Sequence, residues 1–256
     1  MNRLWLNDTA LYRLYLAKRY PAAFALMQAE RSFYAELLGR KVNLIFDVGA
    51  NAGHKAIIFR RLAKKVICFE PDPAAARTLR RRFWSKPEIC VRQIGVSSDS
   101  GILDFQRVSA GSPYNSFSKT WVENQKSIEG SIASTQGDSI PVQVQTLDQL
   151  IGVYGKPDFI KIDVEGFEIE VLKGLSQPIN LISFECNLPK FKEQSIGCVH
   201  KLVSLSNSYV FNYLTSDNQW KFENDWIDDD AITRRISEGS HVFLEVFAKL
   251  DAQGKS

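Results

Sequence analysis

Residues 45–53 read Ile-Phe-Asp-Val-Gly-Ala-Asn-Ala-Gly, and this order of apolar, acidic and glycine positions predicts a nucleotide-binding unit. The apolar run Val42 to Val48 is typical of a buried parallel strand. Gly49 and Gly53 permit a tight turn and the close backbone approach that a ligand needs. A helix is expected from about Ala52 to Leu62, and its free N–H groups would point into the same crevice.

A second strand is expected at Val66 to Phe69, and it runs into the segment Phe69-Glu70-Pro71-Asp72-Pro73. Glu70 follows Asp47 at about the 20-residue spacing of an acid that accepts hydrogen bonds from ribose hydroxyls. Its carboxylate disfavours a nucleotide that carries a 2′-phosphate. Asp72, in the same segment, is a further candidate cofactor-binding residue.

The pattern D-x-G-x-N-x-G, which starts at Asp47, differs from the dinucleotide fingerprint G-x-G-x-x-G by having an acid at the strand end and one glycine fewer. A pyrophosphate would be poorly served by that acid, whereas the sulfonium and ammonium groups of S-adenosylmethionine are attracted to a carboxylate. The motif therefore favours S-adenosylmethionine over NAD. The alternative is that Asp47 and Gly49 merely cap a tight turn and that Glu70 caps the following helix.

The composition bounds the class of protein. A chain of 256 residues with 45% hydrophobic content is consistent with one large α/β domain plus appendages. The 32 basic and 29 acidic residues nearly balance, so no general attraction to nucleic acid follows. Four cysteines without C-x-x-C spacing suggest a reducing, cytoplasmic setting. Neither a signal peptide nor a membrane span is predicted, because no stretch of about 18 apolar residues occurs.

The order of elements predicts a mostly parallel sheet with helices on both faces. Residues 1–40 are expected to form an N-terminal helical extension, interrupted near Tyr20-Pro21 and available for contact with a second copy of the chain. Strands and helices then alternate through the main domain, residues 41–256, with one strand expected at Ile89 to Val96. Two strands, at 209–214 and 241–248, are expected to close the sheet as an antiparallel pair.

The polar segment Ser109 to Gly137 is expected to be a long loop over the active site, because long irregular segments in compact domains are usually functional or disordered. Its candidate substrate contacts are Tyr114, Asn115, Ser116, Phe117 and Trp121. The competing interpretation is an ordinary disordered surface loop.

Acidic residues follow four expected strands, at the sheet edge where ligands bind in open parallel sheets. They are Asp47, Glu70, Asp163 and Glu185. Such a concentration of like charge predicts a cationic ligand, either a sulfonium or a divalent ion. Oxygen ligands of the kind that Mg²⁺ takes are offered by Asp163, Glu165, Glu185 and Asn187, but their spacing gives no metal signature, so the sequence leaves a bound metal open.

Methyl transfer to an oxygen needs a base that removes the proton of the attacking hydroxyl. Asp163 and Glu165 are the nearest acidic candidates for this role, with Glu185 behind them. His54, at the expected helix N-terminus, is a further candidate for contact with ligand or acceptor, although a packing or capping role is more usual for a lone histidine there.

Over about residues 42–190 the chain resembles the FkbM family of S-adenosylmethionine-dependent methyltransferases. The matching motifs are Phe46-Asp47-Val48-Gly49-Ala50-Asn51, Phe69-Glu70-Pro71-Asp72-Pro73, Thr146-Leu147-Asp148, Lys161-Ile162-Asp163-Val164-Glu165-Gly166-Phe167-Glu168 and Ile182-Ser183-Phe184-Glu185. The resemblance implies a Rossmann-like class I methyltransferase fold and methyl transfer to a hydroxyl of a sugar, a glycan or a small hydroxylated metabolite. It also implies cofactor contacts, with Glu70 at the ribose and Asp47, Gly49, Asn51 and Gly53 at the methionine end.

Two other functions remain open on the sequence alone. A nicotinamide-dependent oxidoreductase would require a third glycine near the first turn and a Tyr-x-x-x-Lys pair, and neither is found. A non-catalytic binding module that keeps the cofactor pocket would share every motif above. Binding of S-adenosylmethionine without turnover would distinguish the module from the enzyme.

Overall fold

The protein is described here by a computed structural model that covers residues 10–39, 41–128, 138–216, 220–222, 225–239 and 242–251. The helices are α1 (Ala10–Arg19), α2 (Pro21–Leu38), α3 (His54–Leu62), α4 (Pro73–Arg82), α5 (Lys119–Ile128), α6 (Leu147–Tyr154), α7 (Glu168–Lys173), α8 (Lys192–Leu205) and α9 (Asp229–Glu238). The strands are β1 (Val42–Val48), β2 (Ala63–Phe69), β3 (Ile89–Arg92), β4 (Gly95–Val96), β5 (Gly101–Gln106), β6 (Ser139–Gln145), β7 (Phe159–Ile162), β8 (Leu181–Asn187), β9 (Tyr209–Thr215) and β10 (Phe243–Leu250).

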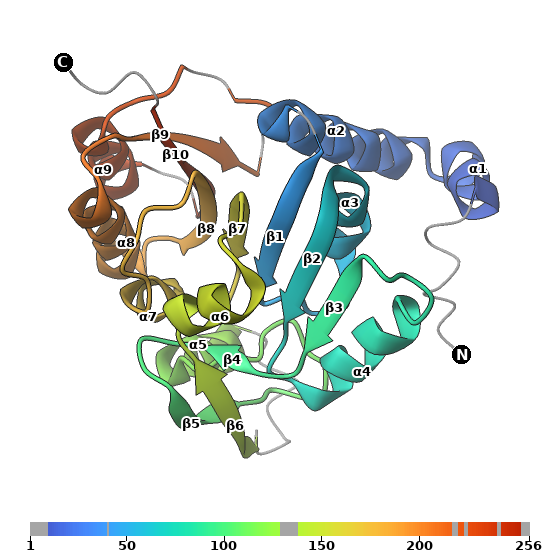
Figure 1. Ribbon diagram of the computed structural model, residues 1–256, viewed down its shortest axis with the longest axis horizontal. Helices are drawn as coiled ribbons and strands as arrows, with labels where there is room; N and C mark the ends of the chain where they lie inside the picture. The colour runs from blue at the N-terminus through green and yellow to red at the C-terminus, as the bar shows by residue number, and fades with distance from the viewer. Residues whose placement is uncertain are drawn as a thin grey trace.

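Seven strands form the main sheet in the order β3-β2-β1-β7-β8-β10-β9 (Figure 1). The neighbouring strands β3, β2, β1, β7 and β8 run parallel to one another, and β10 runs antiparallel to both β8 and β9. The register places Asp47 of β1 between Cys68 of β2 and Lys161 of β7. The predicted Rossmann-like sheet, mostly parallel with an antiparallel C-terminal strand, is confirmed.

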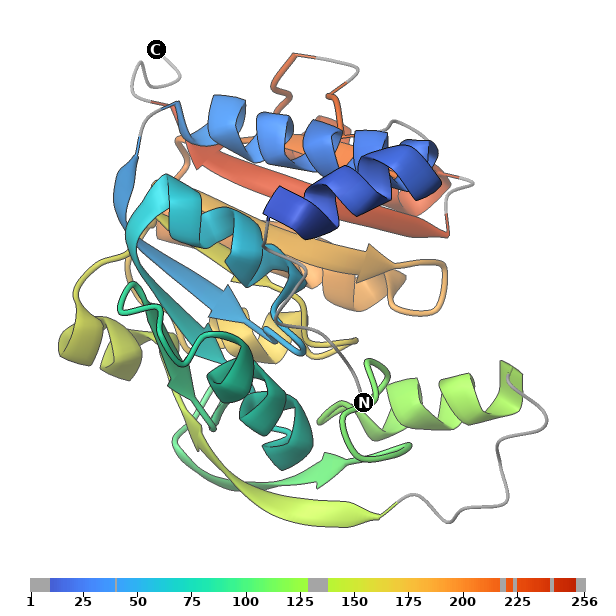
Figure 2. The ribbon, with the colours of Figure 1, turned by 90° about the vertical axis from the view of Figure 1, so that its right-hand side faces the viewer.

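Helices cover both faces of this sheet because alternate residues of its buried strands point to opposite sides. Ile45 and Phe247 belong to a hydrophobic cluster on the side of α2, α3 and α4. Phe46 and Val246, one residue away in each strand, belong to a cluster on the side of α6, α7, α8 and α9. The side view shows α2 and α3 lying across the first of these faces (Figure 2).

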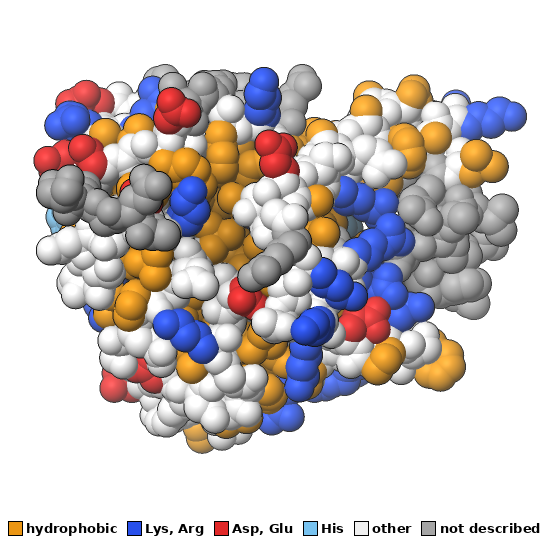
Figure 3. Space-filling view, turned by 45° about the horizontal axis from the view of Figure 1, so that its top comes forward, with side chains coloured by type: hydrophobic (Ala, Val, Ile, Leu, Met, Phe, Trp, Pro, Cys, Tyr) orange, Lys and Arg blue, Asp and Glu red, His pale blue; other side chains and the backbone are white. Residues whose placement is uncertain are grey.

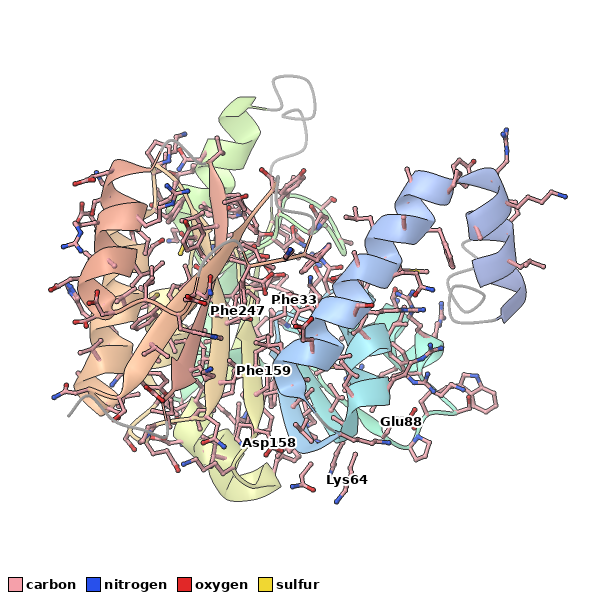
Figure 4. All side chains as sticks on the ribbon, turned by 90° about the horizontal axis from the view of Figure 1, so that it is seen from above. Phe33, Lys64, Glu88, Asp158, Phe159 and Phe247 are labelled. Atoms are coloured by element: carbon pink, nitrogen blue, oxygen red, sulfur yellow. The ribbon has the colours of Figure 1, made fainter. Side chains whose placement is uncertain are left out.

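Helix α2 is packed on the sheet through aromatic side chains. Tyr20-Pro21 separates α1 from α2 as expected, and Pro21 occupies the first turn of α2. Phe33 of α2 meets Phe247 of β10 with ring centroids 5.4 Å apart, and Phe159 lies in the same layer (Figure 4). The division into residues 1–40 and 41–256 stays a prediction, and residues 1–9 and 40 lie outside the described part of the chain.

A second sheet, in the order β4-β6-β5, was not foreseen from the sequence. Residues 89–96, expected as one strand, form β3 of the main sheet and β4 of this second sheet instead. The chain leaves β3 after Arg92 and enters β4 at Gly95, where a Cβ would lie 2.5 Å from Cζ of Phe117. The absence of a side chain at Gly95 therefore leaves room for the ring of Phe117.

The segment 109–137 is not wholly irregular, because it contains helix α5. The hydroxyl of Ser118 accepts a hydrogen bond from the backbone N–H of Trp121 at 3.2 Å, which is an N-cap contact. Trp121 then packs against Phe191 with ring centroids 5.5 Å apart. The expectation of one long loop was therefore wrong for residues 119–128, and residues 129–137 lie outside the described part of the chain.

None of the helices in the described ranges is both long enough and apolar enough to span a membrane. The surface charge is uneven, and Figure 3 shows a band of Lys and Arg side chains in the right half of its view, with Asp and Glu side chains scattered. The near balance of basic and acidic residues thus holds for the whole sequence and not for this face.

Candidate active site

A cavity of about 400 Å³ opens at the carboxyl ends of β1, β2 and β7. This volume lies within the range of about 300–1,000 Å³ that is usual for small-molecule sites, and this edge of an open parallel sheet is where ligands bind. The cavity is lined by residues 47–51, 54–55, 69–71, 94–96, 105, 112–113, 115, 117, 161 and 163–165. The wall thus joins the ends of three central strands to the segment after β5.

The turn after β1 brings the backbone of the first loop against the end of β7. Gly49 has a φ of +81°, and its N–H donates to the carbonyl oxygen of Phe69 at 2.9 Å. A Cβ at this position would overlap the carbonyl oxygen of Asp163. Only glycine therefore satisfies both the left-handed conformation and the close approach.

Asp47 presents a buried carboxylate to the cavity. Its side chain is 1% exposed, and neither of its oxygens has a hydrogen-bond partner among the described residues. Burial raises the pKa of Asp47 from 3.8 to about 6, Lys161 opposes this rise, and Asp163 adds to it. A buried carboxylate without a partner is costly, so the site is suited to a ligand that brings a cation or hydrogen-bond donors.

Glu70 is held by the backbone on both of its oxygens. Oε2 accepts the N–H of Asn51 at 2.7 Å, and Oε1 accepts the N–H of Asp72 at 2.8 Å. Burial raises the pKa of Glu70 to about 8, and the two backbone hydrogen bonds oppose that rise. Each oxygen keeps a further lone pair, so Glu70 can accept hydrogen bonds from two neighbouring hydroxyls.

Two candidate cofactor residues, Asp72 and Gly53, lie outside the cavity wall. Oδ1 of Asp72 caps α4 by accepting the N–H of Ala74 at 2.7 Å, and Oδ2 accepts Nδ2 of Asn115 at 2.9 Å. At Gly53, which precedes α3, a Cβ would lie 2.7 Å from Cδ2 of Leu79 in α4. The structure thus gives both residues packing and positioning contacts behind the wall.

Part of the segment after β5 closes the cavity from the side opposite β1. Asn115 and Phe117 line the cavity, as the sequence anticipated. Between them, the hydroxyl of Ser116 donates to the carbonyl oxygens of Val164 at 3.1 Å and Glu165 at 2.8 Å. These contacts tie the segment to the loop after β7. Two other candidate contacts, Tyr114 and Trp121, are absent from the wall.

The end of β7 and the adjoining strand β8 bring three acids together. Asp163, Glu165 and Glu185 each offer a carboxylate oxygen, and these oxygens lie within 4.8 Å of one another. Burial raises the pKa of both Glu165 and Glu185, and Asp163 adds to both rises. The cluster could hold a divalent cation, since carboxylate oxygens are the ligands that Mg²⁺ prefers. The three acids predicted as candidate bases therefore lie close together, whichever of them removes the proton.

Lys161 was missed as a site residue from the sequence. It is 1% exposed, it lines the cavity, and its Nζ donates to Oδ2 of Asp163 at 2.5 Å. Burial alone would lower the pKa of Lys161, but the carboxylates of Asp163, Glu185 and other neighbours outweigh burial and raise it. A lysine inside an apolar strand, flanked by Ile160 and Ile162, was the signal that could have found it.

His54 is the first residue of α3 and lines the cavity beside Asn51. Burial lowers the pKa of His54, and Arg82 adds to this effect. The imidazole is therefore neutral near pH 7, with one donor and one acceptor nitrogen. The geometry allows contact with a bound ligand.

Comparison with known proteins finds two methyltransferases that are similar in sequence to this chain. Hexuronic acid methyltransferase AglP of Haloferax volcanii is 30% identical over 147 residues, which are 56% of this chain and 54% of AglP. The 2-O-methyltransferase NoeI of Sinorhizobium fredii is 26% identical over 163 residues, which are 58% of this chain and 63% of NoeI. The chain thus spans roughly half to two thirds of the length of these relatives.

A solved structure of methyltransferase FkbM from Methylobacillus flagellatus KT aligns with a TM-score of 0.48 and 15% identity. The alignment covers 86% of this chain and 56% of the chain in that structure. A family model described as Methyltransferase FkbM domain matches residues 47–228, from the acid near the end of β1 to the residue before α9. This match covers more than half of the chain and contains every candidate site residue. The chain therefore belongs to the FkbM methyltransferase domain family.

Proposed function

We propose that this protein is an S-adenosylmethionine-dependent O-methyltransferase that acts on a hydroxyl of a sugar, a glycan or a small hydroxylated metabolite. The observation that carries the proposal is the carboxylate of Asp47, which is buried at the cavity wall with no partner on either oxygen among the described residues. S-adenosylmethionine brings an ammonium group and a sulfonium, and these would supply the missing positive charge.

The rest of the wall supports the same ligand. Glu70 lines the cavity and is held by one backbone hydrogen bond on each oxygen, so its remaining lone pairs would accept hydrogen bonds from the two ribose hydroxyls. Phe69, Phe105 and Phe117 supply apolar surface for a planar base. Gly49 would admit the ligand close to the backbone, since it carries no side chain.

A nicotinamide cofactor fits this wall less well. Its pyrophosphate would approach the turn after β1, where the buried Asp47 would repel it. Membership of the FkbM methyltransferase domain family also argues against an oxidoreductase. The non-catalytic module, in which the pocket binds S-adenosylmethionine without transfer, is separated from the enzyme by experiment.

In the proposed reaction S-adenosylmethionine, when bound, supplies a methyl group on a positively charged sulfur. The chain's part is to hold the acceptor hydroxyl at the cavity and to take its proton on Asp163, which lines the wall. The acceptor oxygen forms the new O–C bond, the sulfur keeps the electron pair of the broken S–C bond, and the proton passes to Asp163. Glu165 and Glu185 are the other candidates for the base.

The acceptor class is proposed from the relatives. AglP is described as a hexuronic acid methyltransferase and NoeI as a 2-O-methyltransferase. Both names are compatible with an acceptor that presents vicinal hydroxyls. We therefore expect sugars, including those that carry a carboxylate, to be the first acceptors to test.

Calorimetric titration with S-adenosylmethionine and, separately, with NAD tests the cofactor. Micromolar binding of S-adenosylmethionine alone is expected, and NAD binding would contradict the proposal. Transfer of tritium from [methyl-³H]S-adenosylmethionine to a panel of p-nitrophenyl glycosides then tests the activity. Binding without transfer to any acceptor would favour the non-catalytic module.

A further inference from the structure

Lys161 sits at the middle of a polar row that crosses four neighbouring strands. It pairs in register with Asp47 of β1 on one side and with Ser183 of β8 on the other. Glu245 of β10 lies opposite Glu185, two residues further along β8. Because alternate residues of a strand share a face, these side chains all point toward the face that carries α2.

Glu245 is fixed within this row by two hydroxyl groups. Its Oε1 accepts the hydroxyl of Tyr34 at 3.1 Å and the hydroxyl of Ser183 at 3.1 Å, and Glu245 is 3% exposed. Tyr34 belongs to α2, which precedes the region matched by the family. The N-terminal helix thus reaches the charged centre of the sheet through one side chain.

We propose that Lys161 is a positioning residue for the transfer step, and that its ammonium holds the Asp163 carboxylate in the orientation that receives the acceptor's proton. The hydrogen bond from Nζ occupies Oδ2 of Asp163, which leaves Oδ1 to face the acceptor. Glu185 and Glu245, the latter held by Tyr34, add electrostatic attraction on the same ammonium. The inference rests on the proposed function, because it needs Asp163 to act as the base.

The geometry favours positioning over simple packing. The side chain of Asp163 is 26% exposed at the cavity, whereas that of Lys161 is 1% exposed, so the buried partner anchors the accessible one. A carboxylate on a short side chain can exchange between staggered rotamers unless a partner favours one of them. Catalytic geometry depends on this kind of support, because small misplacements of a reacting group reduce the rate strongly.

A double-mutant cycle on turnover tests the inference. Lys161→Met is expected to lower kcat by about 50-fold or more, with the affinity for S-adenosylmethionine changed by no more than about fivefold. Asp163→Asn should have a similar effect, and the double variant should be within about twofold of Asp163→Asn alone, because Lys161 acts through Asp163. If Lys161→Met lowered kcat by the same factor in the wild type and in Asp163→Asn, the inference would be overturned.

Unfolding of the unliganded protein gives a second readout that needs no acceptor. Lys161→Met should lower the midpoint of thermal unfolding, because it leaves the Asp163 carboxylate without its partner. Adding Asp163→Asn to Lys161→Met should raise the midpoint of thermal unfolding part of the way back to the wild-type value. Additive shifts would show that the two side chains do not interact and would overturn the inference, whether or not a sugar acceptor has been found.

Two further variants sharpen the test. Lys173→Met removes another lysine–carboxylate pair, the 2.7 Å contact with Glu170 on α7, and should leave kcat within about twofold. Tyr34→Phe should lower kcat by about threefold to tenfold, and only when Lys161 is present. Wild-type protein that does not bind S-adenosylmethionine would overturn the proposed function, whereas full kcat in Lys161→Met would overturn this inference alone.

Discussion

Replacing Asp47 by asparagine should weaken S-adenosylmethionine binding while it stabilises the unliganded protein. Asp47 is 1% exposed and its two oxygens lack partners among the described residues, so a bound cation would be its main source of compensation. Two unit charges about 4 Å apart attract by about 4 kcal/mol at an effective dielectric constant of about 20. Part of this is offset by desolvation of the ligand, so we expect a loss of about 2–3 kcal/mol, or roughly 30- to 150-fold in Kd.

The effect of this variant on stability should have the opposite sign. Burial raises the pKa of Asp47 from 3.8 to about 6, so the folded chain binds the proton more tightly than the unfolded chain does. The free-energy cost of the carboxylate is absent below pH 3.8, grows as the pH rises through this window, and reaches about 3 kcal/mol above pH 6. Asparagine removes the charge but leaves a buried amide, so the net gain near pH 7.5 should be about 1–3 kcal/mol, or about 2–12 °C in Tm.

The affinity of the wild type should also depend on pH in a way that the variant does not share. A proton on Asp47 competes with a cationic ligand, so binding should weaken about tenfold per pH unit below the pKa of about 6. Between pH 7.5 and pH 5 this competition predicts a loss of about 11-fold in affinity. Asp47→Asn lacks this titrating group, so its affinity should fall less than that of the wild type over the same range, and the change that remains comes from Glu70, whose pKa is raised to about 8.

Isothermal titration with S-adenosylmethionine at both pH values measures the binding terms, and thermal unfolding of the unliganded proteins measures the stability term. S-adenosylhomocysteine, which lacks the sulfonium charge, serves as the matched ligand, and its affinity should fall less than that of S-adenosylmethionine. An Asp47→Asn protein that binds S-adenosylmethionine within about threefold of wild type would refute the assignment of Asp47. A lower Tm in the variant would refute the argument that its carboxylate is uncompensated.

Three other changes test other parts of the site. Glu70→Gln should weaken S-adenosylmethionine binding by about 1–3 kcal/mol in calorimetry, because both carboxylate oxygens are already oriented by backbone N–H groups, and unchanged affinity would remove Glu70 from the ribose. Asp163→Asn should lower the turnover rate but spare the affinity for the cofactor, and equal turnover would rule it out as the base. Gly49→Ala should lower the free energy of unfolding in urea by at least about 2 kcal/mol, because its Cβ would overlap the Asp163 carbonyl oxygen. Gly155→Ala, with a φ of +92° and nothing within 4 Å of the added Cβ, should lose only about 1 kcal/mol, and equal losses would contradict the overlap.

The main sheet and the position of the site could be predicted because they depend on local patterns. Apolar runs such as Val42 to Val48 indicate buried strands, and the alternation of strands with helices requires a parallel sheet. Since parallel strands end at one edge, Asp47, Glu70 and Asp163 had to lie near one another. The motif around Asp47 further indicated a cationic ligand rather than a pyrophosphate.

The parts that were missed depend on contacts between distant segments. Residues 89–96 contain apolar residues before and after the pair Arg92-Gln93, and this local pattern does not show that β3 and β4 join different sheets. Helix α5 was hidden by its polar composition, and its N-cap contact at Ser118 became apparent only once the helix was seen. The motif around Asp72 also gives no sign that its carboxylate accepts hydrogen bonds from Ala74 and from the distant Asn115.

The sequence by itself determined the buried strands of a mostly parallel sheet, the acids at the strand ends and the family resemblance, because side-chain periodicity and turn chemistry act over a few residues. The tertiary structure alone decided which charges meet. Tyr34 and Glu245 are 211 positions apart in the chain and hydrogen-bonded at 3.1 Å. Lys161 lies among carboxylates contributed by separate strands. The free energy of a buried charge depends on what surrounds it in space, and no local pattern contains that information.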